Sequence, residues 1–141
     1  YQCAENEIYV LSPEIMEANR VSGAFSHLGA EAYFSSVIVH EVAHSVAASL
    51  PCPFESCIVA EEYVAYALQV MSLTPPERTE FEKQASIDGR VSSEDLSPVY
   101  LFMAPDRFAQ KVWSHLQDRD DPCMYLQSLV KGQLLLDRER F

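Results

Sequence analysis

The chain has 141 residues, of which 48% are hydrophobic, so it is long enough for a single domain, residues 1–141, with a hydrophobic core. Its net charge of −11 argues against a nucleic-acid partner and against binding to anionic membrane surfaces. Membrane insertion is not expected either, because the longest apolar run carries Glu31, His40, Glu41 and His44.

The first thirty residues predict little regular structure. An apolar run within residues 5–11 predicts a short strand, and Ser12-Pro13 is the start signal of a short helix that reaches about Asn19. Residues 20–29 contain several serines and glycines, so we expect a loop or an irregular strand there. His27 lies in this loop and is predicted to be a surface histidine, with a role as an additional metal ligand as the alternative.

Residues 30–50 predict a long helix, because the run is apolar and contains no proline or glycine. It carries the motif H-E-V-A-H, residues 40–44. The four-residue spacing puts His40 and His44 on one helix face, where two neutral imidazole nitrogens can hold two corners of a tetrahedral zinc ion. Glu41 points about 100° round the helix, so its carboxylate can reach a water on the metal as a general base. The alternative is a core helix whose histidines only form hydrogen bonds.

A second apolar helix, residues 58–71, carries the adjacent carboxylates Glu61 and Glu62, which lie 17 and 18 residues after His44. A turn through residues 50–57 would bring this helix back against the first, so that one carboxylate becomes the third metal ligand. Glu61 shares its helix face with apolar residues, whereas Glu62 lies on a mixed face that is more typical of a cleft wall. This favours Glu62 as the ligand, with Glu61 as the alternative. The other carboxylate could accept a hydrogen bond from a ligand histidine.

The remaining chain predicts three more helices and an apolar segment. A capping box at residues 74–77 starts a helix that ends near residue 86, an amphipathic helix follows over 105–118, and a last helix runs from Asp121-Pro122 to near Gly132. The apolar segment 98–103 is expected to pack against the core, and the charged tail 137–141 to fray. Five or six helices with at most one or two short strands predict a mainly α fold, with α+β as the alternative.

The two central helices resemble those of the gluzincin-like metallopeptidases of the zincin superfamily, over residues 36–70. In that family an H-E-x-x-H helix is followed by a glutamate helix with the pattern Asn-Glu-Gly-x-Ala-x-Tyr. This chain has E-Y-V-A-Y at residues 62–66 and lacks the asparagine and the glycine. Matching the small residue three after the glutamate selects Glu62 and Ala65, whereas matching the tyrosine five after it selects Glu61 and Tyr66. The separation from His44 favours Glu62.

The resemblance implies a zinc-dependent hydrolase, a small metallopeptidase with one Zn²⁺ per chain bound by His40, His44 and Glu62, and a peptide or protein substrate. Glu41 would be the catalytic residue that takes a proton from water and passes it to the leaving amine. The resemblance also implies an edge strand for the substrate backbone, for which residues 21–28 are the candidate. A donor that stabilises the oxyanion is expected among five side chains: Tyr33, Tyr63, Tyr66, Tyr100 and His115.

Two other functions stay open at this point. The first is a zincin-fold metal-binding or interaction protein that keeps the metal but has no peptidase turnover. The small size of the chain supports it, because a peptidase usually needs a second lobe or a sheet to form its substrate cleft. The second is a helical interaction module without any metal.

The four cysteines favour disulfides, because their number is even and they contain no C-x-x-C pair. Cys52 and Cys57 bracket four residues of the loop between the two central helices, so we expect them to form one bridge, which leaves Cys3 to pair with Cys123. Disulfides imply an oxidising compartment, periplasmic or secreted, and the start at Tyr1 without methionine fits a processed chain. Four reduced cysteines in the cytosol are the alternative.

Overall fold

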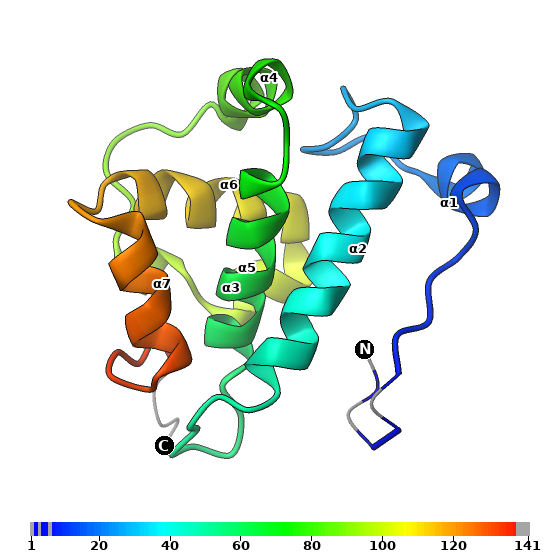
Figure 1. The fold of residues 1–141 in the computed structure, drawn as a ribbon. Coiled ribbons are helices and arrows are strands. Elements are labelled where there is room, and N and C mark those ends of the chain that lie inside the picture. The colour runs from blue at the N-terminus through cyan, green and yellow to red at the C-terminus, as the bar shows by residue number, and fades with distance from the viewer. Residues whose placement is uncertain (1, 3, 6, 138–141) are drawn as a thin grey trace.

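The computed structural model describes residues 2, 4, 5 and 7–137. Within these residues it has seven α-helices and one short 3-10 turn, η1, joined by loops (Figure 1). The prediction of a mainly α fold is confirmed. In chain order the elements are α1 (Pro13–Asn19), α2 (Ala30–Ala47), α3 (Ile58–Met71), α4 (Pro75–Ala85), η1 (Ser93–Asp95), α5 (Pro98–Met103), α6 (Pro105–Gln117) and α7 (Pro122–Val130).

Helix α3 is the centre of the fold. It packs against α2, α5, α6 and α7, and Figure 1 shows α2 along one flank and α7 on the other. Its side chains Val59, Tyr63 and Val70 are completely buried, and Phe108 and Leu116 of α6 are buried with them in one hydrophobic cluster. Each such side chain contributes about 1.5–3 kcal/mol on leaving water, so the helix that carries Glu61 and Glu62 is firmly positioned.

The face that α2 turns to α3 is made of small and polar residues. The buried residues of α2 are Ser36, Ala43 and Ala47, whose spacing places them on one face of the helix. Gln69 of α3 donates a side-chain hydrogen bond to Ser36 Oγ at 3.2 Å, which fixes the two helices against each other. Small side chains at a helix contact allow the two axes to lie close together. His40 shares this face and is thereby brought near α3.

Local capping signals start several helices where the sequence predicts them. Ser12 accepts a hydrogen bond from the backbone of α1, Thr74 and Glu77 form a capping box on α4, and Asp121 accepts from Met124 N at 2.9 Å at the start of α7. A proline occupies the first turn of each of these helices. Short-range sequence chemistry therefore sets these boundaries.

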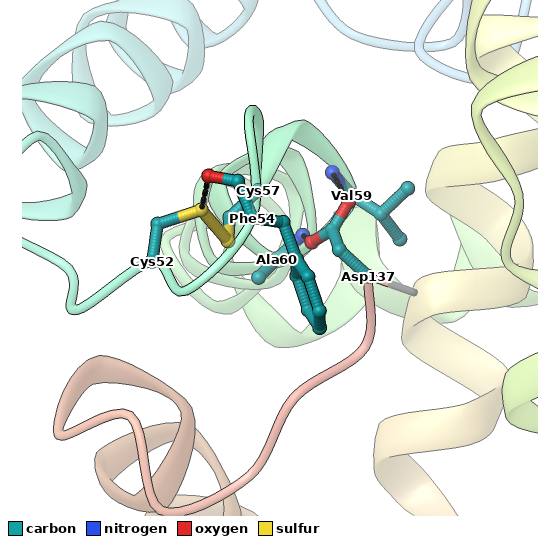
Figure 2. Close-up of a disulfide and its surroundings, with 6 residues drawn as sticks. All are labelled: Cys52, Phe54, Cys57, Val59, Ala60 and Asp137. Carbon is teal, nitrogen blue, oxygen red and sulfur yellow. Dashed lines mark hydrogen bonds between the residues drawn. A yellow bond between two sulfur atoms is a disulfide. The ribbon is translucent and has the colours of Figure 1, made fainter. Parts of the chain in front are cut away.

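The start of α3 is stabilised from the other end of the chain. Its N-cap residue Cys57 makes no side-chain capping bond, and the buried carboxylate of Asp137 accepts hydrogen bonds from Val59 N at 3.0 Å and Ala60 N at 2.9 Å (Figure 2). Cys57 also forms the predicted disulfide with Cys52, with a Cα–Cα distance of 5.8 Å. The bridge and the carboxylate together hold the first turn of α3.

The other predicted bridge is not described. Cys3 lies outside the described residues, so its pairing with the exposed Cys123 stays a prediction. Of the charged tail 137–141, only Asp137 is described, and it is buried rather than frayed. None of the described helices is both long enough and apolar enough to cross a membrane.

Two predictions of strands are wrong. The described part of residues 5–11 forms no strand, and its only pairing is an isolated bridge between Gln2 and Glu7, because no second apolar run lies beside it. Residues 21–28 form bends and turns rather than an edge strand. The segment 98–103, which was expected to pack against the core, is helix α5, and its Leu101 is buried in the core cluster whereas Phe102 is 69% and Met103 80% exposed. A two-turn helix on the rim of the fold buries only one side.

Candidate metal centre

The packing of α2 against α3 brings three side chains from the two motifs together. His40 and His44 of α2 lie one turn apart, with 3.2 Å between their Nε2 atoms. Glu62 of α3 lies opposite them, with Oε2 3.5 Å from His40 Nε2 and Oε1 3.5 Å from His44 Nε2. The three side chains are 12%, 17% and 19% exposed, so the cluster is mostly buried but still reachable from solvent.

These separations agree with those of ligands around one small cation. With metal–ligand bonds of about 2.0–2.2 Å, two corners of a tetrahedron lie about 3.3–3.6 Å apart. The observed distances of 3.2, 3.5 and 3.5 Å are close to that range. Two imidazoles and one carboxylate are also the donor set of catalytic zinc sites that keep a fourth position for water. The residues present therefore fit a zinc ion.

The environment of His44 favours the neutral form that binds metals. Burial lowers the pKa of His44, against the opposing effect of the nearby Glu62 carboxylate. Nδ1 of His40 is buried and has no hydrogen-bond partner among the described residues. Of the two histidines that could donate a hydrogen bond to the other carboxylate, Glu61, His40 therefore does not do so. The position of His40 is set instead by its contacts, including the ring of Tyr66, which packs edge-on with 4.5 Å between centroids.

Of the two candidate carboxylates, Glu62 joins the histidines and Glu61 does not. Only Glu62 belongs to the group of potential ligand atoms that lie within 4.8 Å of one another. Glu61 lines the same hollow, and burial, followed by the nearby negative charges of Asp137 and Glu62, raises the pKa of its carboxyl. His27, the other candidate ligand, is not part of this cluster, and its Nε2 contacts the backbone oxygen of Glu77 at 2.9 Å.

The cluster opens into a hollow of about 570 Å³. Glu41, the predicted general base, lines this hollow together with the three clustered side chains. The other lining residues are Ala48, Ile58, Glu61, Tyr66, Leu101 and Phe102. No sequence pattern indicated the last two, because they come from α5, which the periodicity did not predict as a helix. The hollow therefore combines a potential metal cluster, a carboxylate beside it and an entrance from solvent.

Among the five candidate oxyanion donors, Tyr66 is the one that lines this hollow. Burial raises the pKa of its hydroxyl, so Tyr66 keeps its proton and remains a donor. Tyr63 is completely buried, and its hydroxyl is hydrogen-bonded to His115 Nδ1 at 2.9 Å, which occupies both side chains inside the core. Tyr33 and Tyr100 do not line the hollow.

Comparison with known proteins gives one result. A family model described as "Family of unknown function (DUF6639)" matches residues 1–139, which is almost the whole chain. Neither the curated proteins nor the solved structures contain a match. The chain therefore belongs to the DUF6639 family.

Proposed function

We propose that this protein is a zinc-dependent hydrolase, in the form of a small metallopeptidase that cleaves peptide bonds. The observation that carries the proposal is the convergence of His40, His44 and Glu62 from two helices, with Glu41 on the wall of the same hollow. A structural cluster of buried histidines needs neither the tetrahedral spacing nor a carboxylate beside an open hollow. The Cys52–Cys57 bridge supports a periplasmic or secreted location for this activity.

Each residue has a defined part in the proposed reaction. His40, His44 and Glu62 would hold a zinc ion, which would supply polarisation of the substrate carbonyl and a lowered pKa of the attacking water. The carboxylate of Glu41 would take a proton from the attacking water and give it to the leaving amine. The hydroxyl of Tyr66 donates a hydrogen bond to the oxyanion that develops on the carbonyl oxygen.

The proposal is tested by metal content and by turnover, measured separately. We expect one zinc per chain in the wild type by elemental analysis, retained in Glu61→Ala and lost in Glu62→Ala, His40→Ala and His44→Ala. With casein or an internally quenched peptide mixture as substrate, Glu41→Gln is expected to keep its zinc and to lower the rate by about 100-fold or more, as for loss of a general base. A wild type without zinc after reconstitution, or full activity in Glu41→Gln, would refute the proposed mechanism.

A second function has a specific observation in its favour. Zincin peptidases bind the substrate backbone along an edge strand, and the described residues of this chain contain no strand. The alternative is therefore a zincin-like protein that binds the metal, or a partner through it, without turnover. One zinc per chain together with no cleavage of any peptide in the mixture would favour this alternative.

A further inference from the structure

A second and larger hollow adjoins the candidate metal centre. It has a volume of about 920 Å³, within the range of ordinary ligand sites, and we call it the side pocket. Ile58 and Phe102 line both the side pocket and the hollow at the metal centre, so the two meet at these side chains. A peptide whose carbonyl lies at His40, His44 and Glu62 would therefore place a neighbouring side chain in the side pocket.

The side pocket has an apolar floor and acidic walls. Phe54, Ile58 and Phe102 contribute apolar surface, and the carboxylates come from Glu55, Glu94 and Asp137. No lysine or arginine is among the described residues that line either hollow. Asp137 is buried and already accepts two backbone hydrogen bonds from α3, whereas Glu55 is exposed, so Glu55 is a carboxylate that an incoming cation can pair with.

The wall that carries Glu55 is fixed relative to the metal centre. Glu55 and Phe54 lie within the ring that the Cys52–Cys57 disulfide closes, and this ring ends at the first turn of α3. Figure 2 shows Phe54 in the ring, with Asp137 at the start of the same helix. Glu62 follows on α3, five residues after Cys57. One helix thus connects the acidic wall of the side pocket to a potential metal ligand.

We propose that the side pocket binds a lysine or arginine side chain of the peptide substrate, an inference that rests on the proposed hydrolase function. The aliphatic stem of such a side chain covers the apolar floor, and its cationic end reaches the carboxylates at the wall. A purely apolar side chain covers the apolar surface but forms no ion pair with Glu55, and an acidic side chain is repelled by the negative charge of the pocket.

The inference is tested by binding, which does not require turnover. The probes are two series of peptide hydroxamates, one that places the varied side chain on the amino side of the metal-binding group and one that places it on the carboxyl side. Each series carries arginine, norleucine, glutamate or glycine, and dissociation constants are measured on the zinc-loaded wild type. In one series we expect arginine to bind about threefold to fivefold more tightly than norleucine, as for one exposed ion pair, and glutamate to bind most weakly.

The variant Glu55→Gln should remove most of the preference for arginine over norleucine. High salt should weaken this preference in the wild type in the same way, because it screens an exposed ion pair. Glu31→Gln is the matched control, because Glu31 is exposed and lines neither hollow, and it should keep the preference. Equal binding of arginine and norleucine in both series, or an unchanged preference in Glu55→Gln, would overturn the inference and leave the hydrolase proposal intact. Failure of even the glycine probes to bind the zinc-loaded protein would refute the hydrolase proposal, and the substrate inference with it.

Discussion

Substituting Asp137 by alanine should destabilise the protein far more than the loss of an ordinary helix cap. The carboxylate accepts two hydrogen bonds, from Val59 N at 3.0 Å and from Ala60 N at 2.9 Å, and it is buried. A hydrogen bond to a charged group contributes about 1.5–3 kcal/mol, and a typical N-cap about 1 kcal/mol. In the alanine variant, water from the hollow beside residue 137 can replace part of the two lost hydrogen bonds. We therefore expect the free energy of unfolding to fall by about 3 kcal/mol, which is less than the sum of two such bonds.

The assay is urea unfolding followed by circular dichroism and by the fluorescence of Trp113, the one tryptophan of the chain. Asp137→Asn keeps one acceptor oxygen but loses the charge, so its cost should be about half as large. Asp121→Ala is the control, since Asp121 is exposed and accepts one capping bond from Met124 N at 2.9 Å, and it should cost about 1 kcal/mol. Equal costs for Asp137→Ala and Asp121→Ala would refute the argument that the buried carboxylate holds the start of α3.

Three further predictions concern pH, the disulfide and the thiols. Burial, with a smaller effect of the Arg119 charge, lowers the pKa of His115 to about 4, whereas the unfolded chain should have a pKa of about 6.5. The unfolded state therefore binds the proton first as the pH falls. As a result, the free energy of unfolding should decrease by about 2 kcal/mol between pH 6.5 and pH 4. In His115→Gln this part of the pH dependence should be missing from urea unfolding curves, and an unchanged curve would contradict it. Replacing both Cys52 and Cys57 by serine should cost about 2 kcal/mol by the same measurement, the amount expected for so short a closed loop, and no loss would contradict this role for the bridge. Thiol titration of the denatured, unreduced protein should find no free thiol if Cys3 pairs with Cys123, whereas two free thiols would leave Cys52–Cys57 as the only bridge.

Features that depend on neighbouring residues could be predicted from the sequence. Ser12-Pro13 and the capping box of Thr74 and Glu77 act within one helical turn, so the starts of α1 and α4 follow from local chemistry. The four-residue spacing of His40 and His44 is likewise a property of one helix. The choice of Glu62 over Glu61 rested on the mixed face of its helix and on its separation from His44, and Glu62 is the carboxylate that lies beside the two histidines. Whether this cluster binds zinc stays a prediction.

Features that depend on distant contacts could not be predicted. Asp137 caps a helix that begins 79 positions earlier in the chain, at Ile58, and nothing in the residues around either one indicates the contact. The apolar segment that forms α5 was expected to pack against the core, and Leu101 does so, but no local pattern indicated that Phe102 and Met103 would be exposed. The strand expected within residues 5–11 would have required a partner strand, which no local pattern can supply.

The contact between Ser36 and Gln69 fixes the distance between α2 and α3, and the geometry of the candidate metal centre depends on that distance. The two potential imidazole ligands belong to α2 and the carboxylate to α3, so any change in the spacing of these helices alters both histidine–carboxylate distances at once. A substitution such as Ala43→Val, in the contact face and outside the ligand set, would push the helices apart by a fraction of an ångström. Metal affinity would then depend on the packing of the two helices as well as on the three ligand side chains. Conversely, an ion bound between α2 and α3 would stabilise their contact.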